Sequence, residues 1–214
     1  MTQQTATATY DVVLVGGGLA NSLIALRRTD SDLEVVGVYD KHRLVPFGEF
    51  LPLRPLMEAI GVARLAPGAL DFWPGPGPRT LHLPGFPAVS PRVCYEIIFA
   101  DASIDRSDPP GWLLNASNDA WFSDAGAYMH LAQARLRAIE QGMSVARATP
   151  TGVSAMIDPR GRVLASIARG RAGRLDVRLP AALSPTPYRR AGEIIPLLLA
   201  LLMTVAAMAL ARRN

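Results

Sequence analysis

The one cysteine of this 214-residue chain, Cys94, lies in an apolar segment two residues before Glu96. A thiol attacks a carbonyl carbon efficiently only as a thiolate, so it needs a base or a cation nearby. Lys41 and Glu49 bring such charges in a second, largely apolar and turn-like segment, YDKHRLVPFGEFLP. A lysine beside the thiol stabilises both the thiolate and the oxyanion formed by its attack, and a glutamate acts as a base or holds the lysine in place. These residue types predict covalent catalysis at a carbonyl group.

Each of these residues also has a structural interpretation that requires no chemistry. A lone cysteine in an apolar strand is more often an inert part of the core. Lys41 on its own suits a solvated surface, and Glu96 can pair with an arginine. A Cys–His dyad that uses His42 or His130 is a further alternative, which spacing along the chain does not test.

Three longer motifs in a fixed order favour catalysis. KHRLVPFGE begins at Lys41, CYEIIF at Cys94 and NASNDAWF at Asn115. In this order they resemble the nitrilase-type domain of apolipoprotein N-acyltransferases, and the resemblance extends from about Asn21 to Arg213. It implies an α/β fold, in the form of a partial nitrilase-like αββα sandwich followed by one C-terminal transmembrane helix.

The resemblance also implies a role for each charged residue. Cys94 matches the nucleophile, which takes a fatty acyl group from a phospholipid as a thioester and passes it to the N-terminal diacylglyceryl-cysteine of a lipoprotein. Lys41 matches the lysine that stabilises the tetrahedral intermediate, and Glu49 and Glu96 match two further functional acids. The residues implied to lie near the substrate are aromatic: Tyr95, Trp121, Phe72 and Trp73. The last two belong to a loop rich in Pro and Gly, which we expect to form an acyl-chain or membrane-facing lid.

The family further implies partners and a location. The partners are a phospholipid acyl donor, a diacylglyceryl-apolipoprotein acceptor and the membrane itself. The location is the bacterial inner membrane, with the catalytic domain on its periplasmic side. Neither a cofactor nor a metal is implied. The net charge of +4 is spread over dispersed arginines without interleaved aromatics, which argues against nucleic-acid binding.

The apolar segment near the C-terminus, IIPLLLALLMTVAAMAL, contains no charged residue. With its neighbours it is long enough to cross a bilayer. Because the segment is apolar on all faces, we expect a transmembrane helix over residues 192–211, preceded by a linker at 181–191. Arginine pairs flank both ends, so the distribution of charge does not decide its orientation.

The N-terminal stretch TYDVVLVGGGLANSLIALRR indicates a different protein class. Gly16 and Gly18 fill the first two places of a G-x-G-x-x-G dinucleotide fingerprint, with Asn21 at the third place and Asp40 in the position of the ribose acid. About the first 40 residues resemble the start of lycopene cyclases and related flavoproteins. An N-terminal flavin-binding module is therefore an alternative function.

One catalytic residue of the acyltransferases has no match. Their general base is a glutamate upstream of the lysine motif, whereas the only acid before Asp30 here is Asp11. We therefore expect residues 1–20 to be a foreign or aberrant segment joined to a partial nitrilase-like domain at 21–180, and the chain to be truncated and weakly active or inactive. The competing functions are a soluble-type nitrilase or amidase that hydrolyses C–N bonds, and a membrane-tethered fragment without catalysis.

Hydrophobic periodicity and turn residues predict the elements that position these groups. Helices are expected at Leu19–Arg28, where the acyltransferase resemblance instead implies a strand, and at Ala127–Gly142. The second helix is expected to have one apolar face, made of Met129, Ala132, Leu136, Ile139 and Met143. The sequence DPRG predicts a hairpin turn. Strands are expected at 11–15, 33–38, 92–99, 112–116, 144–148, 152–157, 162–167 and 175–179.

Overall fold

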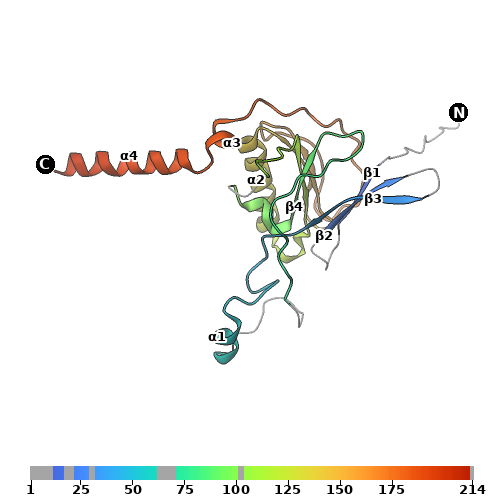
Figure 1. Cartoon of the computed structure of the whole chain (residues 1–214), viewed down its shortest axis with the longest axis horizontal. Coiled ribbons are helices and arrows are strands. Elements are labelled where there is room, and N and C mark those ends of the chain that lie inside the picture. Colours follow the sequence, from blue (N-terminus) through green and yellow to red (C-terminus); the bar gives the residue numbers. More distant parts are fainter. Residues whose placement is uncertain (1–11, 17–21, 29–31, 62–70, 101–103, 213–214) are drawn as a thin grey trace.

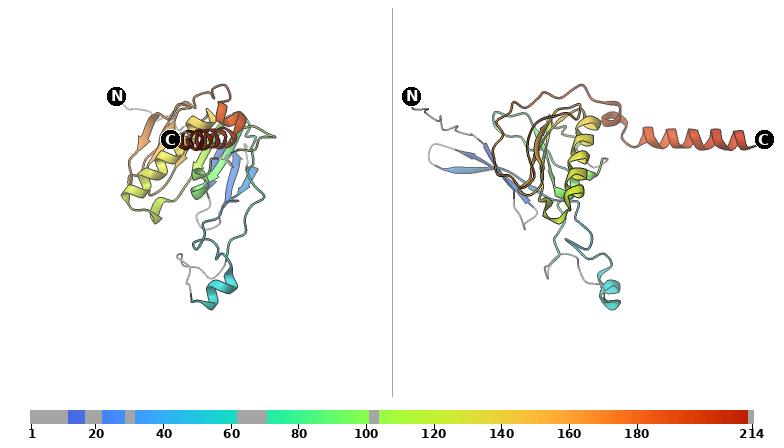
Figure 2. Two further views of the ribbon diagram at one scale, coloured as in Figure 1. Left: turned by 90° about the vertical axis from the view of Figure 1, so that its left-hand side faces the viewer. Right: turned by 180° about the vertical axis from the view of Figure 1, so that it is seen from behind.

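A computed structural model of the chain describes residues 12–16, 22–28, 32–61, 71–100 and 104–212. Two β-sheets lie face to face, and one long helix covers the outer face of the larger sheet (Figure 1). A second long helix leaves this body and extends away from it, as the two further views confirm (Figure 2). The architecture is α/β, as the sequence predicts.

The smaller sheet has three antiparallel strands in the order β1 (Val12–Gly16), β2 (Ser22–Arg28) and β3 (Leu33–Asp40). β1 and β3 confirm the strands expected at 11–15 and 33–38. Between β2 and β3 the register shifts by a bulge, and the two strands stay paired to the end of β3. The catalytic lysine candidate follows directly after that end.

The helix expected at Leu19–Arg28 is wrong for Ser22–Arg28, which form a strand paired on both sides. Leu23 and Ala25 of this segment are buried and recur with the period of two that a strand requires. Pairing with both neighbours satisfies the backbone hydrogen-bonding groups, which overrides the local helical pattern. Residues 19–21 lie outside the described residues.

The larger sheet has five strands, of which the first three are parallel and the last two antiparallel. They are β4 (Val89–Val93), β5 (Trp112–Ala116), β6 (Ser144–Ala148), β7 (Ser154–Ile157) and β8 (Val163–Ile167). β5 to β8 confirm four of the expected strands, although β7 and β8 begin later than expected. The DPRG sequence joins β7 to β8 as the predicted hairpin turn, in which the Gly161 N–H donates to the Asp158 carbonyl at 2.9 Å.

The strand expected at Leu175–Leu179 is wrong, because these residues form no ladder. Leu175 and Val177 instead line a groove over β6 and β7, so their apolar side chains cover the sheet without extending it.

Two apolar clusters hold the layers together. The cluster between the sheets consists of residues from β2 to β5 and the segment between them: Leu23, Ala25, Tyr39, Leu81, Leu83, Val89, Trp112 and Leu114. The cluster between the larger sheet and the helix consists of Ile97, Ile104, Leu113, Ala134, Ala138, Met143, Val145, Ala155 and Ile157. The first cluster positions the end of β3 against β4, and the second positions the helix against the carboxyl ends of β4 to β6.

The outer face of the smaller sheet carries exposed apolar side chains: Ile24, Leu33, Val35 and Val38. An αββα sandwich covers this face with helices, and no described residue forms such a layer. The described body is therefore three layers of a four-layer sandwich, which agrees with the partial nitrilase-like fold expected from the motifs.

The helix that covers the larger sheet, α2 (Asp124–Gln141), confirms the helix expected at Ala127–Gly142. Its N-cap is Ser123, whose hydroxyl accepts the Gly126 N–H, and its C-cap is Gly142 with a φ of 64°.

The apolar face predicted for α2 is wrong. Met129 is 67% exposed, and Leu136 and Ile139 are 45% and 48% exposed. The buried side instead consists of three alanines and three polar residues: Ala127, Ala134, Ala138, His130, Arg137 and Gln141. Small residues allow the helix to approach the sheet closely. Of the polar residues, His130 bonds to Asp119 and to the Cys94 carbonyl, and Arg137 donates to the Ile98 carbonyl.

The C-terminal region contains a short helix, α3 (Pro187–Ala191), and then α4 (Ile194–Ala211). α3 occupies the last five residues of the expected linker at 181–191. α4 is long and apolar enough to cross a membrane, with a mean hydropathy of 2.6 and none of its residues buried in the protein. Such an exposed apolar surface suits lipid and not water.

Candidate active site

Cys94 lies at the turn where β4 ends. The strand expected at 92–99 is wrong beyond Val93, because Cys94–Ile98 form a short 3-10 helix. Cys94 itself has a φ of 50°, in the left-handed region that residues with a Cβ seldom adopt. The Glu96 carboxylate accepts the Val93 N–H at 2.8 Å and so closes the turn. This local geometry places a half-buried thiol at the carboxyl end of a parallel strand.

Glu96 also connects this turn to the lysine segment. Its Oε1 accepts the backbone N–H groups of His42 at 2.7 Å and Arg43 at 3.2 Å. The Tyr39 hydroxyl donates to Oε2 at 2.8 Å. Glu96 is 1% exposed, so these bonds form away from water. Residues on both sides of Lys41 are thereby joined to the turn that carries the cysteine.

Electrostatics favour the charged form of Glu96. Burial alone would raise its pKa, but the hydrogen bonds from His42, Val93 and Tyr39 outweigh burial and hold the pKa below its usual value. Burial and the Glu96 charge both raise the pKa of Tyr39, so its hydroxyl stays protonated and remains a donor.

Lys41 forms a buried ion pair with Glu49, with 2.5 Å between Nζ and Oε1. The second oxygen of Glu49 accepts the Val45 N–H at 2.8 Å. The Lys41 side chain is fully buried. Of the two roles considered for this glutamate, its contacts match the one in which it holds the lysine.

The structure adds a buried polar group, of which the sequence analysis considered only His130. Asp119, His130 and Arg147 lie together beside Cys94 and bond to one another. Arg147 belongs to a row across the sheet, in which Arg92, Asn115 and Arg147 face one another in register on β4, β5 and β6. The signal in the sequence was a polar residue near the end of each of these apolar strands, which is costly unless it is hydrogen-bonded.

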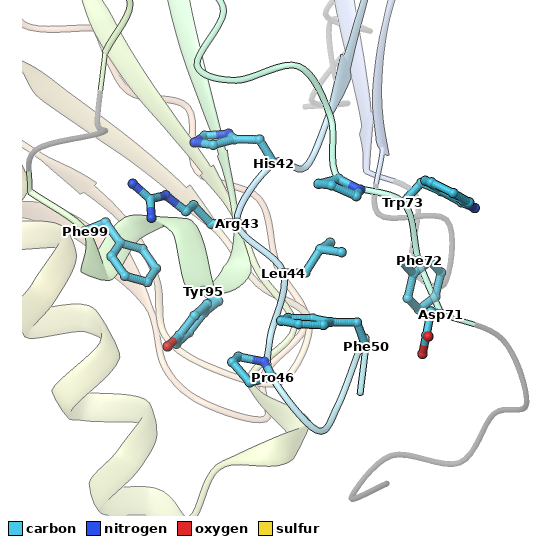
Figure 3. Close-up of a pocket in the computed structure, with 11 residues that line it drawn as sticks. His42, Arg43, Leu44, Pro46, Phe50, Asp71, Phe72, Trp73, Tyr95 and Phe99 are labelled. Carbon is cyan, nitrogen blue, oxygen red and sulfur yellow. The ribbon is translucent and has the colours of Figure 1, made fainter. Parts of the chain in front are cut away.

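A cavity of about 620 Å³ opens next to the lysine segment and the cysteine turn. Most of its lining is apolar or aromatic: Leu44, Pro46, Phe50, Phe72, Trp73, Pro74, Tyr95 and Phe99, together with His42, Arg43 and Asp71. Figure 3 shows Arg43 and Phe99 on one side of it and Phe72 and Trp73 on the other. The guanidinium of Arg43 lies over the Phe99 ring, 4.9 Å from its centroid.

Three of the four predicted substrate-binding residues therefore meet at one cavity: Tyr95, Phe72 and Trp73. The loop of Phe72 and Trp73 is bonded to the lysine segment. The Phe72 N–H donates to the Glu49 carbonyl at 2.9 Å, and the Gly75 N–H donates to the Lys41 carbonyl at 2.8 Å. Trp121 does not line the cavity and is 62% exposed.

The described residues around the glycines do not form the strand and helix of a dinucleotide site. The fingerprint needs a helix after the glycines, whose N-terminus faces the pyrophosphate. Here Gly16 ends β1, and the next described element is the strand β2, which pairs antiparallel with β1. Gly18 and Asn21 lie outside the described residues.

Comparison with known proteins gives a family match over most of the chain. Residues 5–187 match the carbon-nitrogen hydrolase family. The chain is similar to the apolipoprotein N-acyltransferase of Rhodopseudomonas palustris, with 49% identity over 175 residues that cover 81% of this chain and 32% of the relative. It is 46% identical to the enzyme of the same name from Bradyrhizobium diazoefficiens over 186 residues, covering 86% of this chain and 34% of the relative. The chain thus spans about a third of the length of these curated relatives.

The solved structures that match are less similar to this chain in sequence. An amidase of the nitrilase superfamily from Nesterenkonia matches with a TM-score of 0.43 and 19% identity, covering 74% of this chain and 56% of the amidase. A carbon-nitrogen hydrolase from Helicobacter pylori matches with a TM-score of 0.47 and 16% identity, covering 70% of this chain and 52% of the hydrolase.

Replacing Glu96 by Gln tests whether its hydrogen bonds hold the lysine segment and the cysteine turn together. The variant places an amide N–H₂ against N–H donors in a buried site, so we expect E96Q to lower the free energy of unfolding by about 2–4 kcal/mol. Thermal unfolding in detergent, followed by circular dichroism, measures this as a lower Tm. E58Q is the control, because Glu58 makes only an exposed ion pair with Arg54. Equal melting curves for E96Q and E58Q would contradict this role.

Asp119 makes stability depend on pH in the acid range. Burial alone would raise its pKa, but the bond from His130, the charge of Arg147 and the Ser117 hydroxyl lower it to about 2, from 3.8. Because the pKa is lower in the folded protein, the stabilisation is complete above about pH 4 and is lost as the pH falls through about 2; its size is roughly 2 kcal/mol. We expect the Tm of D119N to fall less steeply than that of wild type over this range, with D108N as an exposed control. Parallel curves for wild type and D119N would contradict the assignment.

Proposed function

We propose that the chain, which belongs to the carbon-nitrogen hydrolase family, is the C-terminal part of an apolipoprotein N-acyltransferase. In this proposal Cys94 carries a fatty acyl group from a phospholipid to the N-terminal amine of a diacylglyceryl-cysteine lipoprotein. The observation that supports it most directly is the set of hydrogen bonds accepted by Glu96, which connects the segment of Lys41 to the turn of Cys94. The 49% identity to a curated relative of that name adds to this support.

The proposed chemistry has two steps. The Cys94 thiolate attacks the ester carbonyl of the phospholipid and forms a C–S bond, while the Lys41 ammonium stabilises the oxyanion. Collapse of this intermediate breaks the C–O bond and releases the lysophospholipid, whose oxygen takes up a proton. The lipoprotein amine then attacks the thioester, loses a proton to a base and expels the Cys94 thiolate.

Neither Glu49 nor Glu96 supplies the base that this scheme requires. Glu49 is bonded to Lys41, and Glu96 accepts hydrogen bonds from both segments, so neither carboxylate is free to take the proton. The curated relatives are roughly two and a half times as long as this chain, and the resemblance to them implies a base on a glutamate upstream of the lysine motif. We therefore propose that the chain alone transfers acyl groups weakly or not at all.

The cavity suits the acyl donor. Its aromatic and aliphatic walls match an acyl chain, and Arg43 places a guanidinium at one side, where a phosphate group would be bound by charge and by hydrogen bonds. Trp73 is 91% exposed and Phe72 faces the cavity, which is consistent with a lid that meets lipid.

The membrane helix supports the proposed location. α4 would anchor the chain in the bacterial inner membrane, with the catalytic domain on the periplasmic side, where it would meet its phospholipid and lipoprotein partners. An amidase that releases its acyl group to water is the second candidate, because that family uses the same thiol and lysine. The apolar cavity and α4 favour a lipid substrate over a small soluble amide.

Trapping of an acyl-enzyme tests the proposal. An activated ester such as p-nitrophenyl palmitate needs no acid to protonate its leaving group, so the chain in detergent should form a hydroxylamine-sensitive palmitoyl adduct on Cys94, detected by mass spectrometry. C94S should form no such thioester, and K41M should form it at least tenfold more slowly; E58Q is the surface control. Release of palmitate without an amine acceptor would favour the amidase, and no adduct at all would refute both candidates.

Competition between lipids tests the role assigned to Arg43. A short-chain phosphatidylglycerol should slow adduct formation at lower concentration than a diacylglycerol of the same chain length. In R43Q the inhibition constant of the phospholipid should rise about fivefold or more, while that of the diacylglycerol stays the same. R79Q provides the control, because Arg79 lies on the surface and does not line the cavity. Equal inhibition constants in wild type and R43Q would refute phosphate binding by Arg43.

A further inference from the structure

The backbone conformation of Cys94 must be held by its neighbours. A residue with a side chain at a φ of 50° is disfavoured by contact of its Cβ with the backbone, and such a conformation persists only where the surroundings enforce it. Glu96 holds one end of the turn by accepting the Val93 N–H. His130 holds the other end, with its Nε2 at 3.2 Å from the carbonyl oxygen of Cys94. The carbonyl can only accept, so Nε2 is the donor.

The imidazole of His130 is held in one orientation. It is 4% exposed on the inner side of α2, and its Nδ1 lies 2.9 Å from Asp119 Oδ1. The Phe122 ring meets it edge-on, with 5.3 Å between the ring centroids. A carboxylate on the far nitrogen and a ring against its side prevent the imidazole from turning away from Cys94.

Asp119 is itself enclosed. The Ser117 hydroxyl donates to its Oδ1 at 2.9 Å, and Arg147 pairs with its other oxygen, with neither side chain of that pair exposed. The loop before β7 closes over the carboxylate so tightly that a Cβ on Gly152 would lie 2.1 Å from Asp119 Oδ2. A buried ion pair of this kind is costly in free energy unless every group in it is bonded, and the bonds to Ser117, His130 and Arg147 meet that condition for Asp119.

Arg147 completes this buried group. It is anchored by bonds to Asn115 and to the Val153 carbonyl. Burial lowers the pKa of the guanidinium, and the negative charge of Asp119 opposes that effect. The pair with Arg147 therefore fixes the carboxylate that orients His130.

The contact of His130 also decides against a Cys–His dyad. Its Nε2 is bonded to the carbonyl oxygen of Cys94, and Nδ1 to Asp119, so neither nitrogen is left to act as a base on the thiol. Its effect on the reaction would be exerted through the backbone of Cys94.

We propose that His130 is a positioning residue, oriented by Asp119 and through it by Arg147, which holds Cys94 in its left-handed turn. This rests on the proposed function, in which Cys94 is the nucleophile, and it adds a second set of residues to the acyl transfer. None of them belongs to the lysine segment.

The rate of alkylation by iodoacetamide tests this proposal without any lipid substrate. Because Cys94 is the only cysteine, every alkylation event reports on it. We expect H130A to react at least tenfold more slowly than wild type near pH 7. H130Q, whose amide N–H can still donate to the Cys94 carbonyl, should recover part of the rate. Alkylation of folded H130A at the wild-type rate would overturn the proposal.

The chain contains a matched control. His82 pairs with Asp108 at 2.8 Å on the surface, with 67% and 46% of the two side chains exposed. H82A therefore removes a histidine from a similar ion pair away from Cys94 and should leave the rate unchanged. If H130A fails to fold by circular dichroism, D119N provides the second test. It keeps the shape of the side chain, and it should slow alkylation severalfold; no change would again overturn the proposal.

The two proposals fail in different ways. If wild-type Cys94 reacts no faster than the cysteine of the unfolded chain and forms no palmitoyl adduct, the proposed function is wrong. If wild-type Cys94 reacts fast and forms the adduct, and H130A and D119N do so equally well, only the positioning role is wrong.

Discussion

The candidate site depends on one buried carboxylate. Glu96 accepts hydrogen bonds from Tyr39, His42 and Arg43 on one segment and from Val93 on the other. A charge taken out of water is stable only when its partners are fixed, so the carboxylate and its donors fix one another. Lys41 and Cys94 lie inside the two segments joined in this way. The hydrogen bonds accepted by Glu96 bring these two segments together, without a direct bond between Lys41 and Cys94.

The rest of the fold holds these two segments in place from both faces of the larger sheet. The cluster between the sheets holds the end of β3, and with it the lysine segment, against β4. On the opposite side of the larger sheet, the alanine-lined face of α2 brings His130 to the carboxyl ends of the parallel strands. Crevices at such strand ends are the usual place for ligands in parallel sheets. The cysteine is thus supported by charged groups from both faces of one sheet.

Motifs and periodicity predicted the parts of this arrangement that depend on nearby residues. The α2 helix, strands β5 to β8 and the hairpin turn at DPRG follow from patterns over a few residues. Two of the errors have one cause: neighbours distant in sequence decided the outcome. Ser22–Arg28 form a strand because β1 and β3 pair with them, and Met129 is exposed because the sheet selected the alanine face of α2. Asp119 and Arg147 could not be paired from sequence, because the spacing of 28 residues between them carries no signal until the strands are in register.

The span of these contacts along the chain has a consequence for synthesis and folding. Tyr39 and Glu96 are 57 residues apart, and Cys94 and His130 are 36 residues apart. Contacts that close long loops form late, since the entropy of closing the loop must be offset by other contacts first. During folding, the thiol would therefore remain an ordinary cysteine until α2 has packed onto the sheet. The environment of Cys94 would then arise together with the finished tertiary structure.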